Sequence, residues 1–318
     1  MPVAAAPELE APRLDLPVQC VVGRDCWVTK YVDLDPGPEM RDFACGRLAD
    51  NGHKGTDFAV RDGRAMEAGV IVRAAAAGTV LGIRDGMDDV STRTTGLAAV
   101  KDKECGNGVV LGHGRDWHTQ YCHLRKGSVR VRKGDEVKAG APLGMIGLSG
   151  ASEYPHLHFE VRRSGKTVDP FVGDGVSATC GLGDRRLWSD NAAAILTYRP
   201  VAVFNSGLSA TPPDEVTARA GALASNSFPA DAEAMIAWAE VLGLKAGDVI
   251  DFAVRLPDGK IRSDRMKVDK SVLHLFPRMS MKRTGERWPA GRYQLEVSVS
   301  RPSHLGEPVV TRSETVVP

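Results

Sequence analysis

Residues 154–161 read YPHLHFEV and place two histidines two positions apart. Side chains alternate between the two faces of a β-strand, so His156, His158 and Glu160 would share one face. Two imidazoles at this spacing could share a metal ion, or one could bind metal while the other moves protons. A half-buried strand without any function has the same alternation, so this segment alone does not decide between a site and an ordinary strand.

Two other motifs supply groups of the same chemical type. GHKGTDF places His53 four residues before Asp57, and QYCHL carries His123. Each motif is weak alone, because H-x-x-x-D arises by chance and a histidine in a strand is more often satisfied by packing. Together the motifs contain three nitrogen or oxygen ligands and further groups for proton transfer. A catalytic zinc site needs such groups, together with a vacant position for water.

The elements that must position these residues read as strands separated by turns, from about residue 53 to 171. Segments 107–113 and 117–124 flank a Gly-Arg-Asp turn and predict a hairpin. Residues 127–150 contain short β segments separated by turns that include glycine. No long helical period interrupts this region, so we expect an all-β, mostly antiparallel core. Residues 85–106, a mix of Asp, Ser, Thr and Gly, predict a long loop.

The second half of the chain has a different character. Residues 172–190 are rich in glycine and predict a linker. Residues 231–244 are the best helix candidate, with an aspartate at the first position as N-cap. Segments 248–261 and 291–301 read as strands, so we expect a small β-sandwich with one short helix.

Composition describes an ordinary globular protein. The chain has 318 residues, which favours two domains, with 42% hydrophobic and 25% charged residues. A net charge of +1 argues against bulk electrostatic binding to nucleic acid or to an anionic membrane. No apolar run approaches the ~20 residues that a membrane span needs. The N-terminus has no basic start followed by an apolar stretch, so we expect no intact signal peptide in this chain.

The cysteines indicate a compartment. An even number of cysteines, none in a C-x-x-C pair, is compatible with disulfides and an oxidising environment. Buried free thiols are the alternative, because cysteine packs well as a small apolar residue. The cysteines allow about fifteen pairings, and their spacing does not choose among them. All of them lie in the first 180 residues: Cys20, Cys26, Cys45, Cys105, Cys122 and Cys180.

The motifs and their order resemble the lysostaphin/LytM-type zinc metallopeptidases, the M23 family, which cut peptide bonds in bacterial cell-wall peptidoglycan. The matching text is GHKGTDF, NGVVLGHG, QYCHL, VRKGDEVKAGAPLGMIGLSG and YPHLHFEVRRSGKTVDP. The resemblance implies a compact antiparallel β core with a narrow groove and zinc at its floor. It also implies one Zn²⁺ per chain, with His53, Asp57 and His158 as ligands, and His123 and His156 as a non-ligand catalytic pair.

Under this resemblance, zinc would activate a water molecule and polarise the scissile carbonyl. One of His123 and His156 would take the proton of the attacking water and pass it to the leaving amine. The other would stabilise the tetrahedral oxyanion, and the sequence does not assign the two roles. Glu160 shares the functional face, but we give it no ligand role.

Three features depart from the family pattern. Tyr154 stands where we expect a small residue, and it could narrow the groove or contact substrate. Cys122 also stands at a small-residue position and could pair with Cys105, which is a hypothesis. The loop 85–106 is longer than in a minimal family domain, so it could form a groove wall or a lid.

The remaining histidines carry no expected chemistry. His113 occupies a polar hairpin position of the family and is interpreted as structural, while His118 lies across the same hairpin and is expected to face solvent. His274 and His304 lie far apart in the second half. We expect neither of them to have carboxylates nearby.

The expected organisation has four parts. Residues 1–49 form an N-terminal extension with cysteines, 50–171 the zinc peptidase domain, 172–190 a linker and 191–318 the β-sandwich accessory domain. We expect a periplasmic or secreted zinc endopeptidase that cleaves peptidoglycan cross-links or stem peptides. Its second domain would position the enzyme or bind an envelope protein, and we expect neither nucleic-acid binding nor a membrane span.

Two other functions compete with this one. A non-catalytic regulator would bind peptidoglycan or activate another hydrolase, but such family members typically lack metal ligands, and here the set is complete. A zinc peptidase that acts on proteins would share every catalytic residue, so only its substrates would distinguish it.

Overall fold

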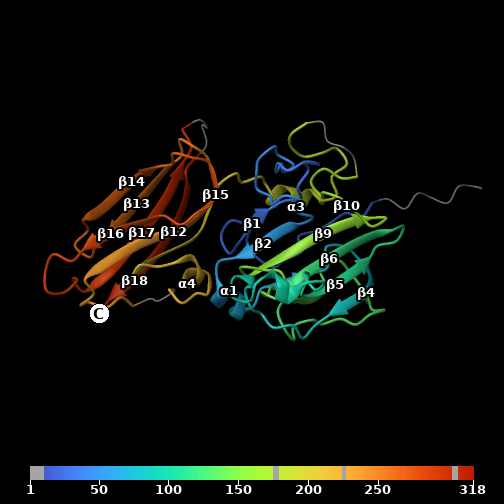
Figure 1. Cartoon of the computed structure of the whole chain (residues 1–318), viewed down its shortest axis with the longest axis horizontal. Helices are drawn as coiled ribbons and strands as arrows, with labels where there is room; N and C mark the ends of the chain where they lie inside the picture. Colours follow the sequence, from blue (N-terminus) through green and yellow to red (C-terminus); the bar gives the residue numbers. More distant parts are fainter. Residues whose placement is uncertain (1–10, 175–178, 224–226, 303–306) are drawn as a thin grey trace, which may run out of the picture. The chain divides into compact units, whose positions relative to one another are not determined.

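The computed structural model describes residues 11–174, 179–223, 227–302 and 307–318, and the chain divides into two compact units. Unit 1 contains residues 28–59 and 68–198 together with most of the N-terminal segment, and unit 2 consists mainly of residues 199–318. Strands dominate both units (Figure 1). In the described residues no helix exceeds six residues, which confirms the expected all-β class.

An eight-stranded sheet forms the centre of unit 1. Its order is β1-β2-β9-β6-β5-β4-β7, with β10 paired to β9, and the ladders from β2 to β7 are antiparallel. The strands are β1 (Cys26–Lys30), β2 (Thr56–Val60), β4 (Gly78–Arg84), β5 (Asn107–Gly112), β6 (Trp117–Leu124), β7 (Glu136–Val137), β9 (His156–Arg163) and β10 (Lys166–Thr167). The hairpin expected from the sequence is therefore confirmed as β5–β6.

Smaller elements complete unit 1. A two-stranded sheet pairs β3 (Ile71–Arg73) with β8 (Pro142–Met145). The helices of unit 1 are α2 (Thr92–Thr95), α3 (Asp190–Ile195) and a 3₁₀ turn η1 (Leu97–Val100), whereas all but the last residue of α1 (Gly63–Ala68) belongs to unit 2. The segment expected as a long loop thus contains α2 and η1, and it is held in place. Asn107 exchanges two 2.8 Å hydrogen bonds with the backbone of Met87, and the N–H of Thr92 donates to the carbonyl of Ser152.

Strand β9 has the alternation expected from its sequence. Leu157 and Phe159 are fully buried, and Phe159 lies 5.3 Å from Tyr121 and 5.6 Å from Trp188 between ring centroids. On the other face His156 is also buried, with 5% of its surface exposed. Both faces of the strand are therefore covered, and a buried histidine on the second face needs polar partners there.

Segments outside the expected peptidase boundaries contribute to unit 1. Strand β1 joins the main sheet, and the ring of Phe43 stacks on Phe171 at 4.3 Å. Trp188, in the segment expected to be a linker, is fully buried and forms a bridge with Leu14. The four-part division of the chain stays a prediction.

The cysteines are oxidised. Cys105 pairs with Cys122, the one pairing hypothesised from the sequence, and Cys45 pairs with Cys180, which the sequence did not predict. The remaining two cysteines, Cys20 and Cys26, are disulfide-bonded as well. Among the described residues no helix has the length and hydropathy required to cross a membrane.

Unit 2 is a sandwich of two four-stranded sheets, as expected. One sheet contains β11 (Ala202–Ser209), β12 (Ala234–Leu244), β15 (Val272–Leu275) and β16 (Arg278–Lys282). The other contains β13 (Val249–Arg255), β14 (Ile261–Lys267), β17 (Gly291–Ser300) and β18 (Val309–Val317), and a short helix α4 (Glu215–Arg219) accompanies them. Side chains from both sheets, such as Val241 and Phe252, belong to one hydrophobic core.

The prediction of a helix over residues 231–244 is wrong, because residues 234–244 of this segment form strand β12. The strand pairs with β11 on one side and with β15 and β16 on the other, so most of its side chains are buried on both faces. A strand buried on both faces reads as a continuous apolar run, which periodicity cannot distinguish from a buried helix. Its alanines, leucines and methionine favour a helix locally, and sheet pairing overrides that preference.

Candidate metal centre

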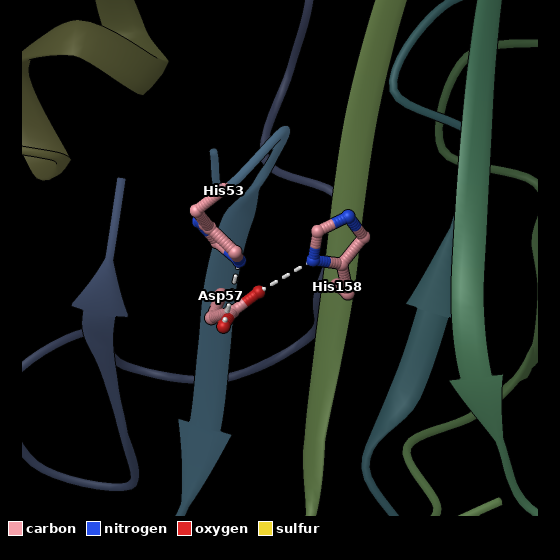
Figure 2. Close-up of side chains that lie close together, drawn as sticks. All are labelled: His53, Asp57 and His158. Atoms are coloured by element: carbon pink, nitrogen blue, oxygen red, sulfur yellow. Dashed lines mark hydrogen bonds and ion pairs between the residues drawn. The ribbon is translucent and has the colours of Figure 1, made fainter. Parts of the chain in front are cut away.

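Two neighbouring strands bring the H-x-x-x-D and H-x-H motifs together. In the antiparallel ladder between β2 and β9, Asp57 is directly opposite His158. Residues directly opposite on paired strands project to the same face, so the carboxylate and the imidazole meet. His53 precedes β2 and reaches the same carboxylate (Figure 2).

The three side chains converge on a small volume. Nε2 of His53 lies 3.2 Å from Oδ2 of Asp57, and Nδ1 of His158 lies 2.9 Å from Oδ1 of Asp57. One ligand atom of each residue lies within 4.8 Å of the others, so the group could hold a metal ion. Zinc bonds of 2.0–2.1 Å in a tetrahedron separate ligands by roughly 3.3 Å, close to these distances. Two imidazole nitrogens and a carboxylate are also a donor set that zinc accepts.

The surroundings fix the orientation of these ligands. Nδ1 of His53 donates to the carbonyl of Tyr31 over 2.7 Å, which leaves its Nε2 for the centre. Gly55, inside the H-x-x-x-D motif, lies directly beside His158. A Cβ at this position would be 2.7 Å from Nε2 of the ring and 2.8 Å from the carbonyl oxygen of Phe159. The glycine is therefore needed for the close approach of the motif to β9.

The charges around Asp57 favour its ionised form. Burial would raise the pKa of Asp57, but the imidazoles of His53 and His156 and the hydrogen bond from His158 hold it well below 3.8. Burial likewise would lower the pKa of His53, and the Asp57 carboxylate raises it to about 9. The buried carboxylate thus carries a negative charge that imidazoles, or a cation held with them, compensate.

His123 and His156 lie beside these three residues. The ring centroid of His123 is 4.7 Å from that of His156 and 5.9 Å from that of His158. Nδ1 of His123 donates to the carbonyl of Ser149, and Nδ1 of His156 to the carbonyl of Tyr154, each over 2.8 Å. A neutral imidazole with Nδ1–H keeps a lone pair on Nε2, so both rings are prepared to accept a proton there.

Burial keeps both rings neutral. Burial is the main reason why the pKa of His156 is lowered from its ordinary value. Burial also lowers the pKa of His123 to well below 6.5, and the nearby His156 and His158 act in the same direction. The structure therefore brings together all five residues that the sequence nominated: His53, Asp57, His123, His156 and His158.

These residues line a groove of about 550 Å³. Thr92, Leu97 and Glu104 of the 85–106 segment also line it, so this segment forms part of a groove wall. Tyr154 lines the groove too, and its ring centroid lies 4.9 Å from that of His156. Glu160 lines the groove while accepting a 3.0 Å hydrogen bond from Oγ1 of Thr167.

Lys30 is a groove residue that sequence reasoning missed. Its ammonium forms an ion pair with Asp50 and lines the groove. No local motif marks Lys30, because its place depends on the pairing of β1 with the main sheet. His113, by contrast, is structural as interpreted: its ring bonds the carbonyl of Ala77 and Oγ1 of Thr119.

Comparison with known proteins agrees with this geometry. Residues 51–170 match the model of peptidase family M23. This segment is an M23 peptidase domain. The strands β2, β6 and β9, which carry Asp57, His123, His156 and His158, all lie within it.

Two relatives show the range of proteins to which the chain is similar. The chain is 35% identical over 117 residues to the peptidoglycan DD-endopeptidase ShyA of Vibrio cholerae, covering 37% of this chain and 22% of ShyA. It is 35% identical over 95 residues to the murein hydrolase activator EnvC of Escherichia coli, covering 29% of this chain and 22% of EnvC. The chain thus spans less than a quarter of the length of either relative.

A solved structure is also similar. A mutant catalytic domain of the prophage-encoded M23 protein EnpA from Enterococcus faecalis is 24% identical, with a TM-score of 0.33. The match covers 52% of this chain and 98% of that domain.

Proposed function

We propose that this chain is a zinc-dependent endopeptidase that hydrolyses peptide bonds in the cross-links or stem peptides of bacterial peptidoglycan. The observation that carries the proposal is the convergence of three metal-binding side chains and two further histidines on one groove of the M23 domain. The oxidised cysteines support a periplasmic or extracellular location.

Three residues would hold the ion: His53 through Nε2, Asp57 through its carboxylate and His158 through Nδ1. A bound zinc ion supplies Lewis-acid chemistry, which polarises a carbonyl and makes water more acidic. The protein contributes the orientation of the ligands, through the Tyr31 carbonyl behind His53 and the close approach at Gly55.

His123 and His156 would carry the proton transfers. Each ring is held by a backbone carbonyl at Nδ1, so Nε2 is the atom that accepts the proton of the attacking water. An imidazole protonated in this way becomes a donor at Nε2. The histidine that takes the proton of the water would pass it to the leaving amine. The other would donate from Nε2 to the tetrahedral oxyanion after taking up a proton of its own from solvent, because its Nδ1–H is already bonded to a backbone carbonyl.

A non-catalytic activator is the second candidate, because EnvC is named a murein hydrolase activator. An activator needs no complete set of catalytic groups, whereas all five lie together here. The complete set favours the enzyme. In either case unit 2 would position the protein on the cell wall or bind an envelope protein, while the net charge of +1 provides little general attraction to an anionic polymer.

The test uses purified disaccharide-peptide dimers from cross-linked peptidoglycan, with an unfolded protein as a second substrate. Zinc-loaded protein should convert the dimers to monomers, detected by mass spectrometry, and the His123→Ala variant should not. Cleavage of only the protein substrate would move the proposal to a protein-directed peptidase. If zinc-loaded protein leaves both substrates intact yet accelerates a partner hydrolase, the activator is correct.

A further inference from the structure

A second cluster of metal-binding side chains lies within unit 2. Glu240 on β12, His274 on β15 and Glu215 on α4 form it, together with Arg219. The expectation that His274 has no carboxylates nearby is therefore wrong, since sheet pairing brings together residues 34 positions apart. The other histidine of this half, His304, lies outside the described residues.

The strand register explains the contact. Leu242 on β12 is directly opposite His274 on β15, and Glu240 is two residues from Leu242 on the same face. Nε2 of His274 lies 2.9 Å from Oε1 of Glu240, and Nδ1 lies 3.7 Å from Oε2 of Glu215. One ligand atom from each of the three residues lies within 4.8 Å of the others.

Glu240 carries an unsatisfied oxygen. The residue is completely buried, and its Oε2 has no hydrogen-bond partner among the described residues. A buried carboxylate oxygen without a donor is costly, so such an atom points to a missing partner. The unsatisfied atom belongs to the same carboxylate that contacts His274.

Arg219 compensates only part of the charge. Its Nε contacts Oε1 of Glu240 at 2.5 Å, and its NH1 atom contacts Oε1 of Glu215 at 2.9 Å. Two carboxylates and one guanidinium leave one negative charge when the imidazole is neutral. The first metal centre likewise contains a buried carboxylate, that of Asp57, with imidazoles around it. Both clusters can therefore accept a divalent cation.

We infer that unit 2 binds a second divalent transition-metal ion, of the zinc class, through Glu215, Glu240 and His274. An imidazole nitrogen with two carboxylate oxygens suits such an ion better than Ca²⁺ or Mg²⁺, which prefer all-oxygen sites. Arg219 acts as a positioning residue, because it holds one oxygen of each carboxylate. The side chains of His274 and Glu215 are 26% and 19% exposed, which gives an ion a path from solvent.

The ion would be structural. It would join α4 to β12 and β15, elements of unit 2 that carry the three ligands. Binding to the folded state alone stabilises that state by mass action, so the effect appears as a metal-dependent melting temperature. This inference concerns residues outside the M23 domain and does not depend on the proposed peptidase activity.

The experiment counts metal ions on the full-length chain. Protein stripped with a chelator is dialysed against low-micromolar zinc, and bound zinc is measured by mass spectrometry. We expect two zinc ions per chain in the wild type, one in Glu240→Gln and one in His158→Ala. Glu314→Gln, which changes an exposed carboxylate on β18, should keep both ions.

The His158→Ala variant separates the two sites. If its single ion occupies unit 2, X-ray absorption should show nitrogen and oxygen ligands with one imidazole, and zinc should raise its melting temperature. Should Glu240→Gln fail to fold, a substitution of the partly exposed His274, His274→Ala, serves instead, and this variant should lose the same ion. One ion in the wild type and none in His158→Ala would overturn the inference. That result would leave the first metal centre intact.

Discussion

The backbone N–H of His123 donates a 2.8 Å hydrogen bond to the carbonyl of Cys105, which forms a disulfide with Cys122, the residue before His123. His123 has a φ of 62°, a conformation that is unfavourable for residues other than glycine. The hydrogen bond, the disulfide and the contact of its ring with Ser149 together hold this conformation. Such strain is typical where a structure must fix a functional side chain.

Removing this disulfide should therefore affect turnover more than metal binding. In Cys105→Ala/Cys122→Ala we expect a lower kcat and unchanged zinc content. The free energy of unfolding should fall by about 3 kcal/mol, as for a closed loop of this length. Turnover, zinc content and denaturant unfolding measure the three effects. Cys45→Ala/Cys180→Ala is the control: it should lose stability but retain kcat. Equal losses of kcat in the two double variants would show that the disulfide has no specific role.

Substitution of ligands and non-ligands should have different consequences. His158→Ala should lower the bound zinc by one equivalent and abolish turnover. His123→Ala and His156→Ala should keep that zinc while losing roughly 10²- to 10⁴-fold in kcat, the usual contribution of a general acid or base. Zinc content and kcat on the same preparations check this. Loss of zinc in His123→Ala would mean that this residue is a ligand.

Gly150 should be required for the loop that holds His123. It has a φ of 77°, and a Cβ there would lie 2.4 Å from the carbonyl oxygen of Glu104. Gly150→Ala should destabilise the protein and displace the neighbouring Ser149 carbonyl, which lowers kcat. Gly140→Ala is a matched control, because its φ of 79° is similar and no atom lies within 4 Å of its Cβ. In Gly140→Ala the free energy of unfolding should fall by about 1 kcal/mol from backbone strain alone, and kcat should be unchanged. Equal effects on kcat would refute the role of Gly150.

Asp169 should make stability depend on pH. Burial raises its pKa to about 7 from the ordinary 3.8, and the Asp42 carboxylate acts in the same direction. The folded state therefore binds the proton more tightly, so the stabilisation is complete below pH 3.8 and is lost as pH rises to 7. The loss is on the order of 4 kcal/mol, since each pH unit corresponds to about 1.4 kcal/mol.

Asp169→Asn imitates the protonated carboxyl. The N–H of Phe171 can still donate to the remaining oxygen, as it does over 2.7 Å to Oδ1 of Asp169. Urea unfolding between pH 4 and 8 should show the variant to be more stable than the wild type at pH 8 and similar at pH 4. The exposed control Asp264→Asn should follow the wild type. Parallel curves for wild type and Asp169→Asn would show that Asp169 titrates normally.

Local patterns predicted the peptidase core, whereas long-range contacts determined what the sequence did not reveal. The alternation around His158 and the H-x-x-x-D spacing are short-range signals, and the strands they imply occur. Strand β12 was misread as a helix, since only its neighbours on both sides show that it is a central strand. The contact of Glu240 with His274 and the place of Lys30 in the groove also depend on strand pairing, which no local motif specifies.

The most direct test of the proposed activity is digestion of purified cross-linked peptidoglycan by zinc-loaded protein in ¹⁸O-labelled water. Hydrolysis of a peptide bond places one oxygen from water in the new carboxyl group and creates a new free amino terminus. We predict that mass spectrometry finds both in the soluble products of the wild type, at one defined bond, and neither with His123→Ala. Labelled products in equal amount from both proteins, or none from zinc-loaded wild type, would contradict the assignment of this groove as the active site of a peptidoglycan endopeptidase.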